Sequence, residues 1–280
     1  FLNVRPKTFE YQIKYMKKNF NLIQPSQLSQ ENLPSNAALV TFDDGFKSFF
    51  TNAIPILEKH KIPSIIFLNM GPILGEIFWP GLIVFLCNYR PDFEKYLKSQ
   101  VPSKILQTPI FLSCTRKIVE DYLGMNKEDL SKTISDYVGE FANASDLKNY
   151  SSNEYVYYAN HSYSHYLSCS LNDDEFINDI EKNSMLLRKF PNYIDFFAFP
   201  FGQPNTTFKL KQVELLINNE FKKVFYSSSS NINHSSQEPF LDRINLVEED
   251  NSSYKIKYKV VRPWFLTKIR TFSNNFFKKN

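Results

Sequence analysis

The chain has 280 residues, of which 42% are hydrophobic and 22% charged, a composition typical of a globular protein with one large domain or two small ones. The formal net charge is +4, but residues 251–280 hold eight of the 33 lysines and arginines and no acidic residue, so the first 250 residues carry 25 basic against 29 acidic side chains. This distribution argues against nucleic-acid binding, because the body of the chain has no basic excess.

The first 70 residues predict a strand–helix–strand unit preceded by another helix. Pro6 is followed by apolar residues at helical spacing, and proline is common in the first turn of a helix. The expected elements are a helix containing Phe9, Ile13, Met16 and Phe20, a buried strand over 36–42, a helix over 47–60 with Pro55 as a candidate kink, and a strand over 63–69. Two strands joined by a helix in this way imply a parallel sheet.

Residues 70 to about 150 contain apolar segments at helical spacing (82–88, 116–123 and 127–138) and few strand signals, so we expect a helical insertion there. Strands are then expected over 154–160, 194–200, 222–227 and 240–246, with helices over 173–190 and 206–220. Repeated strand–helix units predict an α/β fold, either a barrel or a doubly wound sheet. In both, functional residues gather at the carboxyl ends of the strands.

Unusual polar residues follow three of the predicted strands. The segment VTFDDGF at 40–46 begins as a buried strand and ends in two adjacent carboxylates, Asp43 and Asp44, and a glycine. Adjacent carboxylates raise each other's pKa and resist burial, so they either lie in a solvated turn or face a positive group. NHSYSH at 160–165 and FPFGQPN at 199–205 follow two later strands.

The segment HSYSH contains two of the four histidines of the chain, His161 and His165. At a spacing of four residues they would lie on one side of a helical turn, with both imidazoles facing one point. Two imidazoles and a carboxylate suit zinc and similar divalent ions. A metal would also explain the paired aspartates, one as a ligand and the other as a proton acceptor. Taken alone, the two histidines would equally fit the surface of a helix start.

These segments resemble the polysaccharide deacetylases, metal-dependent carbohydrate esterases that share the chitooligosaccharide deacetylase homology domain. The family motif TFDDG is present at 41–45, H-[ST]-x-x-H at 161–165, and F-A-[YF]-P-[YF]-G as FAFPFG at 197–202. The resemblance implies a distorted (β/α) barrel with a helical insertion at about 80–150. The catalytic domain would span 1–250, followed by a basic amphipathic tail over 251–280.

The resemblance also implies roles for the motif residues. Asp43 would be the general base. A divalent metal, zinc in the first instance with cobalt, nickel or manganese as alternatives, would be held by Asp44, His161 and His165. Pro200 and Phe201 would shape an acetyl pocket, and the Phe201 backbone N–H would help to stabilise the oxyanion. Such a metal polarises an acetyl carbonyl and acidifies bound water.

Two positions depart from the family pattern. The better-known branch has an arginine where this chain has Ala198, two residues before the proline of the third motif. Arg243, beside another predicted strand, is the candidate to replace it next to Asp43, with a structural salt bridge as the alternative. The usual general acid is a histidine in a late L-x-x-H motif that is not found here. His234, in the serine-rich segment 227–237, is the remaining candidate.

The predicted function is therefore hydrolysis of N- or O-acetyl groups on a carbohydrate, such as a cell-envelope or surface polysaccharide or its precursor. One alternative is a catalytically inactive carbohydrate-binding protein that retains the same barrel. A second is an iron oxygenase, whose metal is also held by two histidines and one carboxylate, although TFDDG has no role in that chemistry.

The location of the protein is a separate expectation. Three cysteines, Cys87, Cys114 and Cys169, lack metal-ligand spacing and indicate free thiols in a reducing compartment. The sequence shows no secretory signal and no run of 18 apolar residues, so we expect a cytoplasmic protein or one at the inner face of the membrane. The chain begins with Phe1 rather than Met, which suggests that a preceding segment has been removed.

The apolar residues of 260–279 fall on one stripe of a predicted helix. This helix would lie either on a membrane surface or against the barrel.

Overall fold

The structure, a computed structural model, describes residues 4–30, 32–101, 111–126, 129–229 and 238–263. Its main sheet has six parallel strands: β3 (Val40–Phe42), β4 (Ser64–Leu68), β5 (Val156–Asn160), β6 (Tyr193–Ala198), β7 (Lys223–Tyr226) and β8 (Phe240–Asp242). The strands lie side by side in the order in which they occur in the chain. Because all are parallel, their carboxyl ends meet at one edge of the sheet.

The sheet is a curled half-barrel rather than a closed barrel. Within the described residues, β3 pairs only with β4 and β8 only with β7, so the two edge strands are not hydrogen-bonded to each other. The expected α/β fold, a distorted barrel with a helical insertion, is confirmed in this open form.

The central strands are buried on both faces. All five residues of β4, with the sequence SIIFL, and all four residues of β7 are buried. Such continuous apolar runs are typical of parallel strands that are covered by helices on one face and by the barrel interior on the other. The one cationic side chain in β7, Lys223, donates through Nζ to the Glu238 carbonyl at 3.0 Å.

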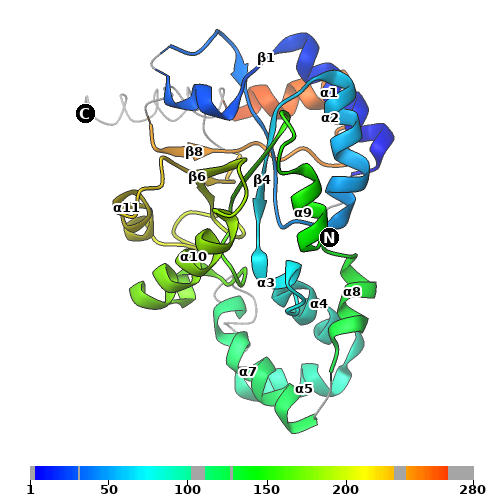
Figure 1. Cartoon of the computed structure of the whole chain (residues 1–280). Helices are drawn as coiled ribbons and strands as arrows, with labels where there is room; N and C mark the ends of the chain where they lie inside the picture. The colour runs from blue at the N-terminus through cyan, green and yellow to red at the C-terminus, as the bar shows by residue number, and fades with distance from the viewer. Residues whose placement is uncertain (1–3, 31, 102–110, 127–128, 230–237, 264–280) are drawn as a thin grey trace, which may run out of the picture.

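Four helices pack against the half-barrel: α1 (Pro6–Asn19), α2 (Ile54–His60), α10 (Asp173–Leu187) and α11 (Leu210–Asn218). In Figure 1, α10 and α11 lie to the left of β4, and α1 and α2 lie to its right. The expected helix over 47–60 is not uniform, because a π-helical turn over Phe49–Ala53 leads into α2. Pro55, the candidate kink, lies in the first turn of α2, directly after this π-helical turn.

The helical insertion between β4 and β5 has a hydrophobic core of its own. It contains α3 (Met70–Ile73), α4 (Trp79–Tyr89), α5 (Pro91–Gln100), α7 (Phe111–Asn126), α8 (Ser131–Val138) and α9 (Ala144–Tyr150). Side chains of α4, α5, α7 and α8 form one buried cluster that includes Trp79, Leu86 and Phe93. Figure 1 shows these four helices beyond the end of the sheet toward which β4 points. They therefore stand next to the edge where functional residues are expected.

Two sequence predictions differ from the structure in detail. The strand expected over 36–42 is divided, since β2 (Ala37–Ala38) pairs with β1 (Asn21–Leu22) in a separate two-stranded sheet, and only β3 joins the main sheet. Short apolar strands carry no signal for which neighbour they join, so the division could not be seen in the sequence. Helices α3, α5 and α9 were also not predicted individually.

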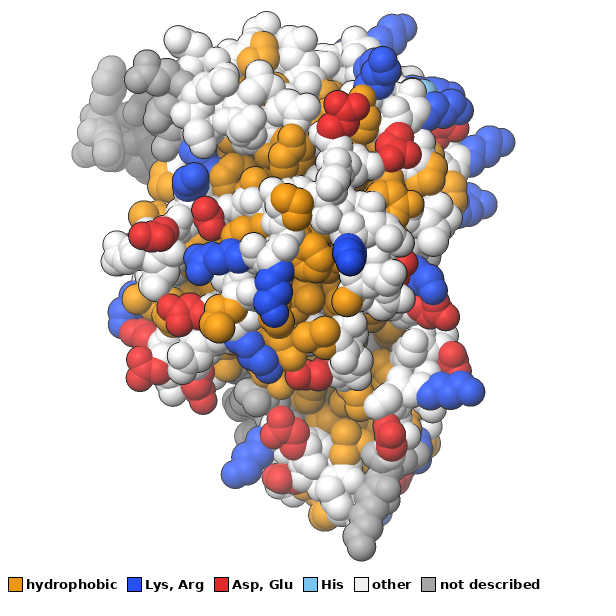
Figure 2. All heavy atoms as spheres, in the orientation of Figure 1, with side chains coloured by type: hydrophobic (Ala, Val, Ile, Leu, Met, Phe, Trp, Pro, Cys, Tyr) orange, Lys and Arg blue, Asp and Glu red, His pale blue; other side chains and the backbone are white. Residues whose placement is uncertain are grey.

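The carboxyl-terminal tail is described only in part. Residues 253–263 are helical, and the remainder of the predicted apolar stripe, from 264 onwards, lies outside the described residues. In the described part of the chain, no helix has the length and apolar character needed to cross a membrane. Membrane contact through 260–279 stays a prediction. Acidic and basic side chains are interspersed over the face shown in Figure 2.

A paired substitution in α4 tests the core of the insertion. Leu86 is fully buried and Val84, two residues earlier, is 39% exposed. We expect Leu86→Ala to lower the free energy of unfolding by about 2–5 kcal/mol, because it leaves a cavity among packed helices. Val84→Ala should change it by less than about 0.5 kcal/mol. Urea unfolding followed by circular dichroism measures both, and equal effects would contradict a packed core around Leu86.

Candidate active site

The predicted site residues meet at the carboxyl edge of the half-barrel. Asp43 and Asp44 follow β3, and Arg243 follows β8 at the opposite edge of the sheet. His161 follows β5 and Phe201 follows β6 shortly after its last residue. The parallel, sequential strand order thus brings together side chains that lie up to 200 positions apart in the sequence.

Three side chains form a cluster suited to a metal ion: Asp44, His161 and His165. One ligand atom from each lies within 4.8 Å of the other two. Asp44 Oδ1 is 3.1 Å from His165 Nε2 and 3.6 Å from His161 Nε2. Both imidazoles are buried, while the Asp44 side chain keeps 24% of its surface exposed. The cluster is therefore reachable from solvent on its carboxylate side.

The chemistry of these atoms fits a divalent cation. His161 Nδ1 lies 2.8 Å from the Ala198 carbonyl, which can only accept, so Nδ1 carries the proton and Nε2 presents its lone pair to the cluster. Burial lowers the pKa of His161, with Asp43 acting in the opposite direction, and this favours the neutral imidazole that a metal requires. Asp44 Oδ1 is a buried oxygen without a hydrogen-bond partner among the described residues. Such an acceptor costs free energy unless a cation or donor satisfies it.

Left-handed backbone conformations, not a helical turn, bring the ligands together. Four non-glycine residues at the site have positive φ: Asp44 (73°), Ser162 (65°), His165 (54°) and Phe201 (62°). The expectation of one helical turn through HSYSH is wrong, because 161–165 is an irregular loop. Non-glycine residues adopt such φ values only where the surrounding structure enforces them, and these residues concentrate at functional sites. The glycine of TFDDG, Gly45, has φ 99° and leaves no room for a Cβ, which would lie 2.9 Å from Leu68 Cδ2.

Asp43 is held by Arg243 instead of by the metal cluster. Arg243 Nη1 donates to Asp43 Oδ1 at 2.6 Å and Nη2 to Asp43 Oδ2 at 2.9 Å, a bidentate pair. Burial would raise the pKa of Asp43, but the charges of Arg243 and His161 and the Arg243 hydrogen bonds together lower it to about 2. The carboxyl group is thus ionised at neutral pH. Its side chain is 34% exposed, so it remains accessible.

Aromatic rings flank His165 on two sides. The ring centroid of Phe201 lies 5.0 Å from that of His165 and the centroid of Phe78 lies 5.1 Å away, both in edge-to-face arrangements. Phe201 N–H makes no hydrogen bond within the described part of the chain, so it is available to a ligand. Pro200 carries the turn into Phe201, and its carbonyl accepts from Gly202 N–H at 2.7 Å. Phe78, which immediately precedes α4, was missed because an isolated phenylalanine in a helical insertion has no motif.

A half-buried carboxylate that the sequence did not reveal holds the loop between the two histidines. Asp179, in α10, accepts the backbone N–H of Tyr163 at 2.9 Å and that of Ser164 at 3.2 Å. Burial raises the pKa of Asp179, while these donors act against that shift. The carboxylate thereby fixes the backbone between the two histidines. It follows the motif by 14 residues on another element, so no local spacing indicated the contact.

Two features lie outside this constellation. His234, the candidate general acid, falls in 230–237, outside the described residues.

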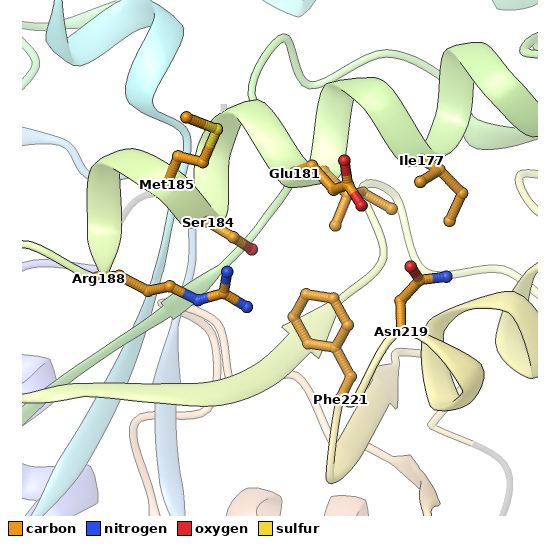
Figure 3. Close-up of a pocket in the computed structure, with 8 residues that line it drawn as sticks. Ile177, Glu181, Ser184, Met185, Arg188, Asn219 and Phe221 are labelled. Carbon is orange, nitrogen blue, oxygen red and sulfur yellow. The ribbon is translucent and has the colours of Figure 1, made fainter.

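A cavity of about 260 Å³ lies between α10 and the turn before β7, lined by residues such as Glu181, Arg188 and Phe221 (Figure 3). None of the predicted site residues lines that cavity, so it does not bear on their chemistry.

Comparisons with known proteins agree with this geometry. No protein-family model matches the chain. A segment of 71 residues is 30% identical to the poly-β-1,6-N-acetyl-D-glucosamine N-deacetylase of Escherichia coli K12; it makes up 23% of this chain and 11% of that protein. IcaB from Ammonifex degensii has a TM-score of 0.55 at 17% identity over 91% of this chain and 89% of its own. The deacetylase PplD of Streptococcus pyogenes, solved with acetate, has a TM-score of 0.57 at 16% identity over 93% and 88%. The chain thus has the fold of solved polysaccharide deacetylases and is similar in one segment to a curated member of that family.

Within the polysaccharide deacetylase fold, the three motifs take up one edge of the half-barrel. Ala198, where the better-known branch has arginine, is fully buried and turns its carbonyl to His161. The guanidinium beside Asp43 comes from Arg243, after the last strand. In this chain the guanidinium group that pairs with Asp43 therefore comes from the opposite edge of the sheet.

A metal-loading experiment tests the cluster. Protein incubated with zinc and then desalted should retain about one zinc per chain, and Asp44→Ala and His161→Ala should retain none, because each removes one of three ligands. His60→Ala is the matched control, since His60 pairs with Glu10 at 3.0 Å away from the cluster. Elemental analysis gives the metal content, and circular dichroism verifies that each variant is folded. Zinc retained in Asp44→Ala would contradict this ligand set.

Proposed function

We propose that the protein removes acetyl groups from a carbohydrate by hydrolysis that depends on a divalent metal. The observation that supports this most directly is the pairing of two neighbouring carboxylates with different partners. Asp44 faces two imidazoles, and Asp43 faces a guanidinium. A site that only binds a metal needs no second, ionised carboxylate beside it, whereas hydrolysis needs a group that accepts a proton.

The metal would be held by Asp44, His161 and His165. When bound at such a site, a divalent ion polarises a carbonyl group and lowers the pKa of a bound water molecule. Zinc is the first choice because of the imidazole ligands, with cobalt, nickel and manganese as alternatives.

The chain's own residues would handle the proton and the developing negative charge. Asp43 accepts a proton as the water oxygen forms its bond to the acetyl carbon. Phe201 N–H, which has no partner among the described residues, would donate to the carbonyl oxygen as it becomes negative. The bond from carbon to nitrogen, or to oxygen in an ester, then breaks, and the leaving atom takes up the proton as acetate departs.

The source of that last proton has two candidates. His234 is the first, as a histidine in the segment after β7. The second is Asp43 itself, because a carboxyl group whose pKa is about 2 is a strong acid once protonated and can pass its proton to the leaving group. Arg243 would keep the carboxylate in position for both transfers.

An N-acetylated polysaccharide is the substrate we propose first. The name of the E. coli relative specifies poly-β-1,6-N-acetyl-D-glucosamine, although this chain matches only 11% of that protein. O-acetylated sugars are the second class. The inactive carbohydrate-binding protein is less well supported, because the E. coli relative and the neighbour PplD are deacetylases by name. An iron oxygenase is not supported, because the sheet is parallel and flanked by helices.

Substitution of Asp43 tests the reaction. Asp43→Asn should lower acetate release from N-acetylated β-1,6-glucosamine oligomers by about 10²- to 10⁴-fold, because the amide cannot accept the proton. Zinc content should remain that of the wild type, since Asp43 is not among the proposed ligands. Enzymatic assay of free acetate, repeated with an O-acetylated oligosaccharide, gives the rates and the substrate class. Full activity in Asp43→Asn would overturn the proposed base.

Substitution of Arg243 tests the guanidinium separately. Arg243→Lys keeps the charge but cannot form the bidentate pair, so kcat should fall by about 10- to 100-fold through misplacement of Asp43. KM and zinc content should change little. Arg5→Lys is the matched control, since Arg5 binds Glu248 through Nε at 2.6 Å on the surface. Equal kcat in Arg243→Lys and wild type would reduce Arg243 to a structural ion pair.

A further inference from the structure

Asn69 lies between the two loops that carry the metal ligands. It is the residue that follows β4, and β4 is the strand between β3, which leads to Asp44, and β5, which leads to His161. The side chain of Asn69 is fully buried. Neither the motifs nor the comparisons assign it any role.

Asn69 bonds to both neighbouring loops. Its backbone N–H donates to the Asp44 carbonyl at 3.3 Å. Its side-chain Nδ2 donates to the Ser162 carbonyl at 3.0 Å and also to the carbonyl of His161. Both side-chain partners are carbonyl oxygens, so the nitrogen of the amide must point toward them.

The hydrogen bonds of Asn69 are made to residues whose backbone conformation is strained. Asp44 and Ser162 both have left-handed φ values, at 73° and 65°. Residues in this region persist only where neighbouring contacts fix them. Asn69 donates hydrogen bonds to the carbonyl groups of Asp44 and Ser162. It therefore holds each loop at the left-handed residue, which is a ligand itself (Asp44) or directly follows one (Ser162).

The position of Asn69 is itself fixed by a buried polar neighbour. Asn183 of α10 donates to the Leu68 carbonyl and to Asn160 Oδ1, both at 2.8 Å, and its own Oδ1 accepts from Met70 N–H at 2.9 Å. Leu68 and Met70 are the residues on either side of Asn69. The Asn183 amide thus uses both of its N–H groups and its oxygen to hold the backbone on either side of Asn69.

We propose that Asn69 is a positioning residue that sets the separation of Asp44 and His161 and thereby the affinity of the site for its metal. The proposal rests on the metal site of the proposed function. Contacts of this kind around metal ligands typically contribute 10- to 100-fold to metal affinity. The amide is suited to the task because it donates two hydrogen bonds without placing a charge near the cation.

The chain offers a matched control in Asn192. It is also buried, and its Nδ2 donates to two carbonyls, that of Val156 at 2.8 Å and that of Tyr150 at 3.4 Å. The side-chain Oδ1 of each asparagine is buried without a hydrogen-bond partner among the described residues. Asn192, however, directly precedes β6 and bonds to Val156, the first residue of β5, at the end of that strand opposite to His161. Substitution of either asparagine should therefore lower the stability of the protein by a similar amount, but only substitution of Asn69 should weaken metal binding.

The test compares Asn69→Leu with Asn192→Leu, which remove both N–H donors and keep the number and branching of the side-chain heavy atoms. Zinc affinity is measured by competition with a chromogenic chelator, and the visible absorption of the cobalt-loaded protein reports ligand geometry. We expect Asn69→Leu to bind zinc about 10- to 100-fold more weakly and to show an altered cobalt spectrum. Asn192→Leu should keep wild-type affinity and spectrum, with a comparable drop in Tm.

Equal zinc affinity in the two variants, or a wild-type cobalt spectrum in Asn69→Leu, would overturn the proposal and leave the proposed function intact. A wild-type protein that binds neither ion would overturn both together. If Asn69→Leu does not fold, Asn69→Ser replaces it. Serine keeps one donor at that position, and an intermediate loss of zinc affinity is then expected.

Discussion

The ion pair between Asp43 and Arg243 joins the two edges of an open sheet. The edge strands β3 and β8 are not hydrogen-bonded to each other in the described residues, and the residues that follow them are linked by two parallel N–H···O bonds. Arg243 also lies over the ring of Phe67, with its Cζ 5.3 Å from the centroid, so packing as well as charge fixes the guanidinium. A side-chain contact thus takes the place of strand pairing at the mouth of the half-barrel.

This pair also explains how two adjacent carboxylates coexist. Each aspartate has its own positive or metal-binding partner, Arg243 for Asp43 and the two imidazoles for Asp44. The left-handed conformation of Asp44 turns the chain between them, and Gly45 allows the backbone to pass close to Leu68. Repulsion between like charges is thereby offset on both sides. In the proposed function, Asp44 binds the metal and its neighbour Asp43 accepts the proton.

The sequence allowed the fold class and the membership of the site to be predicted, but not the geometry. Alternation of apolar strands with helices indicates a parallel sheet, and a parallel sheet collects the ends of its strands at one edge. Asp43, Asp44, His161 and His165 could be grouped on that basis. The histidines were expected on a helical turn, however, because their spacing of four fits one; their convergence instead depends on positive φ values at Ser162 and His165. Asp179, Asn69 and Phe78 act through contacts distant in sequence, for which local spacing carries no signal.

The helical insertion contributes to the site as well as standing beside it. Phe78 packs on His165 and also on Phe46 and Phe141, with ring centroids 5.7 and 5.0 Å away. Phe46 follows the paired aspartates by two residues, so one aromatic cluster connects the β3 loop, the histidine loop and the start of α4. Edge-to-face contacts of this kind stabilise a ring in one orientation. The orientation of the His165 imidazole, which has no hydrogen-bond partner on Nδ1 among the described residues, therefore depends on packing against the insertion and on Phe201. The two histidines are therefore held by different means, His161 by a backbone carbonyl and His165 by aromatic rings. Changes in the packing of the insertion should accordingly affect the proposed metal site through His165.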